Sequence, residues 1–252
     1  MDKLIIFDIS GPFANFRKFY TNSSSSTYIV PPRTVISGLI AGIIGKPRDS
    51  YYEEFSIDNA NIGVKPLTKA KKLTQTINYY NIEIKNKTLR YQVPMEILVP
   101  EKRNELVSYR VYFYHKEEEI FNDFLSRLKD RRFIYNPYLG ITEFLANINF
   151  VSFLDDKSVK KVEINEEDFI EVEGCFNIKY IIKLDTSSNP PVVVNRMPIQ
   201  FKENRELDLF GEYIVEKNCS TIKVKLKKEA PLYKLTYSFN GETKEENIIF
   251  ME

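Results

Sequence analysis

The segment from Pro31 to Pro47 is the feature that most constrains how this chain can fold. Two prolines open it, and proline is tolerated in the first turn of a helix because its missing N–H is not needed there. Gly45 and Pro47 close the segment, and both residue types are common where helices end. Its apolar residues recur with the period of one wide helical face: Val35, Ile36, Leu39, Ile40, Ile43 and Ile44. The segment therefore predicts a helix with a broad apolar stripe.

The rest of the first 155 residues predicts strands and a second helix in a fixed order. Residues 117–131 predict the second helix, with acidic residues at its start, basic residues at its end and apolar residues on one face. Apolar runs predict four strands: residues 3–9, 60–67, 106–114 and 148–154. This order is the β-α-β-β-α-β motif of ferredoxin-like (RRM-like) folds. We expect an α+β fold whose sheet is a common platform for RNA, although a fold alone does not give a function.

Residues 68–106 interrupt this order. Two runs rich in Tyr, Ile, Val and Thr, 74–84 and 88–99, flank a turn-like Lys-Asn-Lys sequence, so we expect a protruding β-hairpin. Residues 156–252 contain only short strand-like runs. We expect a domain over residues 1–155, with the hairpin as an insertion, followed by a smaller and mostly β C-terminal region.

The overall charge gives no sign of a nucleic-acid partner, because 36 basic residues balance 35 acidic ones to a net charge of +1. The distribution along the chain is uneven. Seven basic residues and one acidic residue lie between Lys65 and Arg90, whereas six acidic residues and no basic one lie between Val162 and Glu173. Charge of one sign gathered over a short stretch focuses a field on one surface. One basic face is therefore compatible with the balanced total.

Several classes of protein are disfavoured by what the sequence lacks. No apolar run approaches the ~18–20 residues of a membrane span, and the amino terminus lacks the pattern of a signal peptide. We expect a cytoplasmic protein that does not contact a membrane. Two cysteines and one histidine predict neither a disulfide framework nor a metal site. Phosphate-binding and dinucleotide-binding glycine motifs are absent, so no cofactor is expected.

Basic and aromatic residues alternate around the start of the first helix. Cations bind phosphates and rings stack on bases, which are the contacts that single-stranded nucleic acid requires. Small helix residues would let a phosphate approach the free N–H groups at the helix start. The alternative, tight packing on the sheet with the aromatic side chains in the core, fits the composition equally well. The candidates for RNA binding are Arg17, Lys18, Tyr20, Tyr28, Arg33, Thr34, Ser37 and Gly38.

The expected hairpin is a second basic and aromatic region. Its candidates for RNA binding are Lys69, Gln75, Asn78, Tyr79, Lys85 and Arg90. A basic exposed edge that guards against aggregation is the alternative. We favour RNA binding, because edge protection does not explain the aromatic residues.

A catalytic function would depend on His115, the single histidine of the chain, followed by Lys116. Imidazole titrates near neutrality, so it can act as a general acid or base in metal-free RNA cleavage. A histidine at the start of a helix, without a catalytic role, is the favoured alternative.

Four segments resemble the Cas-five family of CRISPR-associated proteins, which belongs to the RAMP superfamily of RNA-binding proteins. The segments are GPFANFRKFY (11–20), STYIVPPRTVISGLIAGIIG (26–45), NPYLGITEFLANI (136–148) and NRMPIQF (195–201). The resemblance implies a ferredoxin-like domain with residues 68–106 as a protruding thumb. It makes Arg17, Tyr28, Arg33, Thr34, Ser37 and Gly38 candidates for contact with the RNA handle.

The function implied by this resemblance is that of a subunit of a type I CRISPR surveillance complex (Cascade) in antiviral defence. Such a subunit binds and caps the 5′ handle of the CRISPR RNA, contacts the backbone subunit and the large subunit, and reaches target DNA through the complex. The sequence looks most like the type I-B members, which are non-catalytic. The type I-C branch is instead a metal-independent endoribonuclease that processes the precursor RNA, and His115 and Lys116 keep that alternative open.

Overall fold

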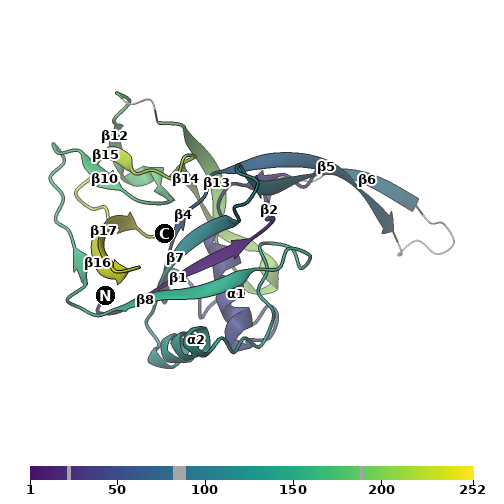
Figure 1. The fold of residues 1–252 in the computed structure, drawn as a ribbon, viewed down its shortest axis with the longest axis horizontal. Helices are drawn as coiled ribbons and strands as arrows, with labels where there is room; N and C mark the ends of the chain where they lie inside the picture. The colour runs from purple at the N-terminus through teal and green to yellow at the C-terminus, as the bar shows by residue number, and fades with distance from the viewer. Residues whose placement is uncertain (22–23, 82–88, 188–189) are drawn as a thin grey trace.

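Figure 1 shows the computed structural model, which describes residues 1–252 except 22–23, 82–88 and 188–189. Its centre is a four-stranded antiparallel sheet in the order β4-β7-β1-β8. The strands are β1 (Leu4–Gly11), β4 (Ala60–Pro66), β7 (Val107–His115) and β8 (Asn147–Leu154). Helices α1 (Arg33–Ile44) and α2 (Glu118–Asp130) lie on one side of this sheet. All six elements predicted for residues 1–155 form, and the α+β class is confirmed.

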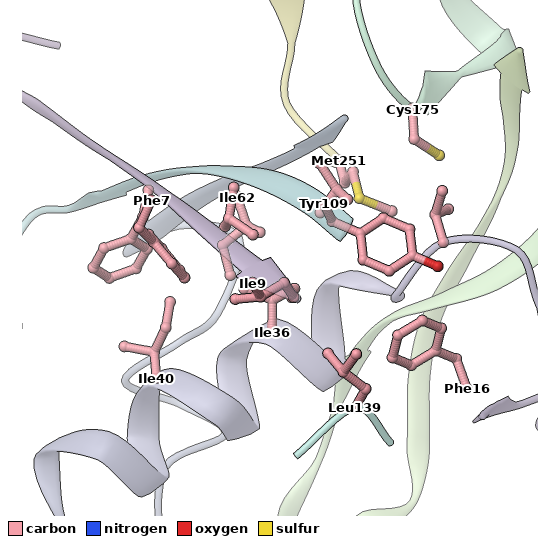
Figure 2. Close-up of a cluster of buried hydrophobic side chains, with 14 of the residues drawn as sticks. Phe7, Ile9, Phe16, Ile36, Ile40, Ile62, Tyr109, Leu139, Cys175 and Met251 are labelled. Atoms are coloured by element: carbon pink, nitrogen blue, oxygen red, sulfur yellow. The ribbon is translucent and has the colours of Figure 1, made fainter. Parts of the chain in front are cut away.

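Strand β1 is apolar along most of its length because both of its faces are buried. Phe7 and Ile9 belong to the main hydrophobic core, where they lie toward Ile40 of α1 (Figure 2). Leu4 and Ile6 belong to a separate core cluster that includes side chains of the C-terminal region. The sheet is therefore packed between the helices and the C-terminal strands.

The expected hairpin is present and projects from the body of the protein (Figure 1). It consists of β5 (Ala70–Asn81) and β6 (Leu89–Pro100), which pair with each other in a two-stranded sheet. Their register runs without a shift from Ala70 opposite Pro100 to Asn81 opposite Leu89. The loop before α1 also contains a short antiparallel pair, β2 (Phe16–Arg17) and β3 (Thr27–Tyr28).

The C-terminal region is built from short strands in three small sheets. Their orders are β10-β15-β12, β11-β14-β13 and β17-β16-β9. The described residues of this region form two short 3₁₀ helices, Ile178–Tyr180 and Glu203–Arg205, and no α-helix. The strands are β9 (Val159–Lys161), β10 (Ile170–Val172), β11 (Phe176–Asn177), β12 (Ile181–Leu184), β13 (Val192–Phe201), β14 (Leu207–Glu216), β15 (Ile222–Leu226), β16 (Leu232–Phe239) and β17 (Glu242–Ile249).

The main core extends across residue 155, which the sequence suggested as a boundary. Met197, Tyr213 and Met251 of the C-terminal region are buried in the same cluster as Phe7 and Ile36. The two regions therefore share apolar contacts, and a domain boundary at residue 155 stays a prediction.

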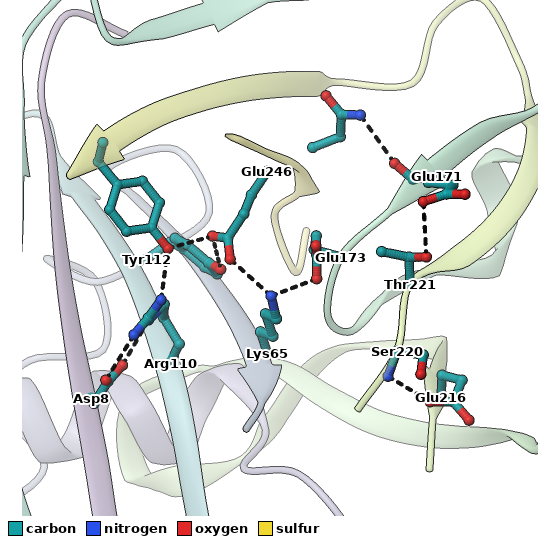
Figure 3. A network of polar contacts seen from close by, with 12 residues as sticks. Asp8, Lys65, Arg110, Tyr112, Glu171, Glu173, Glu216, Ser220, Thr221 and Glu246 are labelled. Atoms are coloured by element: carbon teal, nitrogen blue, oxygen red, sulfur yellow. Dashed lines mark hydrogen bonds and ion pairs between the residues drawn. The ribbon is translucent and has the colours of Figure 1, made fainter. Parts of the chain in front are cut away.

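A buried polar network joins the central sheet to the C-terminal strands (Figure 3). Arg110 on β7 donates two hydrogen bonds of 2.9 Å to Asp8 on β1 and one of 2.7 Å to the Tyr237 hydroxyl on β16. The Tyr237 hydroxyl donates to Glu246 on β17 over 2.8 Å, and Lys65 on β4 pairs with the same carboxylate over 2.8 Å. Strands β16 and β17 thus cover the sheet face that lies away from the helices, so this face is not an open platform for RNA.

Candidate nucleic-acid interface

The hairpin meets two loops of the body at a groove of about 740 Å³, which we call the hairpin groove. Its side chains come from β5 and β6, from the loop that holds β2 and β3, and from the loop before β8. Three residues predicted to bind RNA line it together: Arg17, Gln75 and Tyr79. The other lining residues are Asn15, Ser25, Ile77, Met95, Ile97, Tyr138, Gly140, Ile141, Thr142, Glu143 and Phe144.

The alternation of strand side chains explains why Gln75 and Tyr79 face the same groove. Successive residues of a strand point to opposite faces, so residues 75, 77 and 79 share one face of β5. Met95 lies opposite Gln75 in the register and is almost completely buried. The apolar residues fix this face of the hairpin against the body, and the polar and aromatic ends of Gln75 and Tyr79 stay exposed.

Glu96 on β6 holds the loop and the hairpin together. Its carboxylate accepts hydrogen bonds of 2.8 Å from the backbone N–H of Thr27 and from Lys72, and its backbone carbonyl accepts one of 2.7 Å from the Asn15 amide. Burial alone would raise the pKa of Glu96, but the hydrogen bonds from Lys72 and Thr27 outweigh burial and lower it. Glu96 is therefore a charged anchor of the groove wall.

Gly140 brings the loop before β8 against the same wall. Its φ is +93°, and an added Cβ would lie 1.7 Å from the carbonyl oxygen of Asn15. Only glycine fits a position with this conformation and this close approach. The groove thus has walls that the backbone itself fixes.

Most of the predicted candidates on the hairpin and its neighbouring loop are exposed. Tyr79 is 49 % exposed, and Arg17, Tyr20, Lys69, Gln75 and Asn78 are also exposed. The ammonium of Lys18 lies 5.7 Å from the ring centroid of Tyr20 and 5.8 Å from that of Tyr28. Lys85 lies outside the described residues, as does the side chain of Arg90.

Three predicted candidates at the start of α1 are buried and have structural roles. Arg33 is 1 % exposed and donates to the backbone carbonyls of residues 55, 56, 60 and 199, over 2.7 to 3.2 Å. Burial lowers the pKa of its guanidinium to about 10. The Tyr28 hydroxyl donates to the backbone carbonyl of Arg196, and the Ser37 hydroxyl donates to that of Arg33. The polar atoms of Arg33, Tyr28 and Ser37 therefore face the interior, and RNA contacts by these three residues stay a prediction.

Thr34 and Gly38 line a second groove of about 680 Å³ along α1, which we call the α1 groove. An added Cβ on Gly38 would lie 2.8 Å from the hydroxyl oxygen of Tyr51, so glycine lets this tyrosine lie across the helix. Tyr138 and Gly140 line both grooves. The two grooves therefore adjoin at the loop before β8.

His115 is completely buried, and both of its ring nitrogens are engaged. Its Nε2 lies 2.9 Å from the backbone carbonyl oxygen of Glu54, and its Nδ1 accepts a hydrogen bond of 3.0 Å from the backbone N–H of Glu117. These partners fix the tautomer with the proton on Nε2. In this geometry His115 has no free nitrogen for proton transfer to RNA, whereas Lys116 is exposed beside it.

Neither a metal site nor a membrane span is found in the described part of the chain. Within it, no three side chains of His, Cys, Asp or Glu gather as metal ligands. The helices described there are too short or too polar to cross a membrane.

A family model described as CRISPR-associated protein (Cas_Cas5) matches residues 4–207. The chain belongs to this family. The matched range includes the hairpin, the loops around it and both grooves, so the candidate interface lies within the Cas5 part of the chain.

Two solved structures share the Cas5 fold described above. A CRISPR protein from Archaeoglobus fulgidus matches with a TM-score of 0.54 and 14 % identity, over 97 % of this chain and 99 % of that one. A chain of a CRISPR RNA-guided surveillance complex matches with a TM-score of 0.51 and 12 % identity, over 87 % and 91 %. At such identities the likeness shows the fold alone. No curated protein sequence matches this chain.

The sequence did not single out the contribution of the loop before β8. Tyr138 and Phe144 line the hairpin groove and Tyr135 lines the α1 groove, and none of them was a candidate. A signal was available, because these residues lie in or beside the family-like segment 136–148. Its pattern alone does not show that this loop lies beside the hairpin.

Proposed function

We propose that this Cas5-family protein is a non-catalytic RNA-binding subunit of a type I CRISPR surveillance complex, most similar to type I-B. In this role it binds and caps the 5′ handle of the CRISPR RNA. The observation that carries the proposal is the hairpin groove, where Arg17, Gln75 and Tyr79 present a cation, an amide and an aromatic ring at one place. These are the groups that single-stranded RNA requires.

In this proposal the β4-β7-β1-β8 sheet and its two helices form a ferredoxin-like domain, and the β5–β6 hairpin is its thumb. The hairpin projects from the body (Figure 1), so it can reach a neighbouring backbone subunit while the hairpin groove contacts the RNA. The large subunit contacts another surface, and target DNA is reached through the complex. The complex acts in the cytoplasm in antiviral defence.

Each of the three side chains has a distinct role in the proposed groove. The Arg17 guanidinium binds a phosphate through charge-assisted hydrogen bonds. The Tyr79 ring stacks on a base, and the Gln75 amide can donate to or accept from a base edge. Because Met95 and Ile97 fix the hairpin beneath them, the groove is formed before RNA binds.

The test measures the affinity of the purified protein for a labelled single-stranded RNA with the sequence of the repeat-derived handle. We expect Tyr79→Ala to weaken binding about tenfold, because base–aromatic stacking contributes ~1–3 kcal/mol per base. Phe169→Ala, which removes another exposed ring far along the chain, is the matched control and should leave the affinity unchanged. Equal affinity of Tyr79→Ala and the wild type, with equal melting temperatures, would contradict the proposal.

The alternative function is a metal-independent endoribonuclease as in type I-C systems. The burial of His115 does not favour it. Incubation with precursor repeat RNA in EDTA is expected to give no specific cut. A specific cut that disappears in Lys116→Ala, a variant of an exposed residue that leaves the core intact, would establish the nuclease instead.

A further inference from the structure

Arg196 on β13 and Phe210 on β14 form an exposed pair outside both grooves. The guanidinium carbon of Arg196 lies 3.6 Å from the ring centroid of Phe210. Phe210 is 47 % exposed, and Arg196 is exposed beside it. Both side chains of the pair are therefore accessible from solvent.

Phe19 lies beside this pair and does not stack on the second face of the guanidinium. Its ring centroid is 6.0 Å from the guanidinium carbon of Arg196 and 6.5 Å from the centroid of Phe210. With only 3.6 Å between Arg196 and Phe210, these distances place Phe19 to the side of the stack rather than across it. Neither ring therefore covers the second face of the Arg196 plane.

The charge of Arg196 is also available. In the described part of the chain no carboxylate oxygen lies within 4 Å of its guanidinium, whereas Arg205 pairs with Asp49 over 2.8 Å. Glu212 is the cross-strand partner of Arg196 in the register but makes no ion pair with it. An exposed planar cation that stacks on one ring and has no paired anion suits stacking on a base and attraction of a phosphate.

The loop that lines the hairpin groove also supports this pair. It contributes Arg17 to the groove and Phe19 to the side of the Arg196 stack. The Tyr28 hydroxyl donates a hydrogen bond of 2.7 Å to the backbone carbonyl of Arg196, which fixes β13 to the same loop. RNA in the groove and a base on this pair would therefore be held by one continuous piece of structure.

We propose that Arg196 and Phe210 form a stacking platform for a base of the single-stranded RNA that occupies the hairpin groove. This inference rests on the proposed function. An apolar protein surface is the weaker alternative, because covering Arg196 with it would bury an unpaired charge.

The test uses the full-length protein and a labelled single-stranded RNA with the sequence of the CRISPR repeat. Phe210→Ala and Arg196→Lys are each expected to weaken binding about tenfold, since each removes one plane of the stack. Phe210→Tyr keeps the ring and is expected to keep the affinity. Arg196→Gln is expected also to reduce the slope of log affinity against log salt by about 0.7, because one phosphate contact is lost.

Each of three results would contradict the stacking platform, and one of them would also contradict the proposed function. Unchanged affinity of Phe210→Ala and Arg196→Lys, with Tyr79→Ala weakened, would make the platform wrong and leave the proposed function standing. Unchanged affinity of all three variants would remove both. If the platform variants lose a partner subunit but keep their RNA affinity, the surface docks protein and the inference is wrong.

Discussion

The start of α1 and the hairpin groove contain the same kinds of residue but use them in opposite ways. Both are basic and aromatic in sequence. At the start of α1, Arg33 and Tyr28 are buried and donate to backbone carbonyls, whereas Arg17 and Tyr79 at the hairpin are exposed. The comparison shows that composition identifies groups able to bind RNA, while the tertiary neighbours decide which of them can reach it.

The largest effect on stability is expected when Arg33 is replaced. We expect Arg33→Ala to lower the free energy of unfolding by about 3–5 kcal/mol, because four buried carbonyls lose a charged donor. Arg33→Lys should rescue only part of this loss, since an ammonium has three donors and lacks the planar fork. Urea unfolding measures both values. An Arg33→Ala protein with normal stability and reduced RNA affinity would contradict the structural role of Arg33 and favour a role in RNA binding.

The predictability of the fold follows the range of the interactions that determine each part. The four strands and two helices predicted for residues 1–155 are visible in the sequence because their signals are local, such as the apolar stripe of α1 or the apolar run of β1. Strand β17 is not visible in the sequence because it is mostly polar, although Asn240-Gly241, both with positive φ, marks the hairpin that pairs it with β16. The buried position of the Arg33 side chain could not be predicted, because one of its hydrogen-bond partners is the carbonyl of Ile199, far along the chain.

The hairpin groove could likewise be predicted only in part. The groups on β5 could be identified because strand alternation is local and places residues 75 and 79 on one face. The loop before β8 could not be placed against them from the sequence. Its position depends on Gly140 meeting the backbone of Asn15, a contact between segments more than a hundred residues apart.

The polar network around Glu246, between the central sheet and strands β16 and β17, is a second buried set of charged groups with a structural role. Burial alone would raise the pKa of Glu246, but Lys65 and the hydroxyls of Tyr112 and Tyr237 outweigh burial and lower it below 4.5. Because the folded-state pKa is the lower one, this stabilisation is present above pH 4.5 and is lost as the pH falls through the folded-state value. We expect Glu246→Gln to cost about 2–3 kcal/mol at neutral pH and to flatten the acid limb of the stability profile.

Glu245→Gln is the matched control for this prediction. Glu245 is the neighbour of Glu246 on β17 and pairs with Lys234 on the surface, where both side chains are well exposed. Such a pair contributes about 0–1 kcal/mol. Equal effects of Glu246→Gln and Glu245→Gln on thermal unfolding between pH 3 and 8 (roughly a range that brackets the ordinary pKa values of carboxylates near 4) would contradict the role given to the network.

Gly140 combines both situations, because its close packing against the backbone of Asn15 shapes the exposed hairpin groove. Gly140→Ala is expected to cost more than the ~1–3 kcal/mol of a strained φ alone, because the added Cβ would also meet the backbone of Asn15. Gly241→Ala has a similar φ of +82° but no atom within 4 Å of the added Cβ, so it should show the backbone strain alone. If the fixed wall matters, Gly140→Ala weakens RNA binding at a temperature where it is still folded, and Gly241→Ala does not.

The smallest effect on stability is expected for Arg17→Ala, because Arg17 is the exposed counterpart of the buried Arg33. Arg17 is exposed and makes one hydrogen bond of 3.0 Å to the backbone carbonyl of Thr21, so its loss should change the free energy of unfolding by less than about 0.5 kcal/mol. Its loss should nevertheless weaken RNA binding several-fold and reduce the slope of log affinity against log salt by about 0.7. Arg132→Ala, which removes another exposed arginine, controls for the change in net charge. A binding loss shared equally by Arg17→Ala and Arg132→Ala would mean that RNA senses the total charge of the protein and not the groove, whereas a loss confined to Arg17→Ala would separate binding from stability at a single side chain.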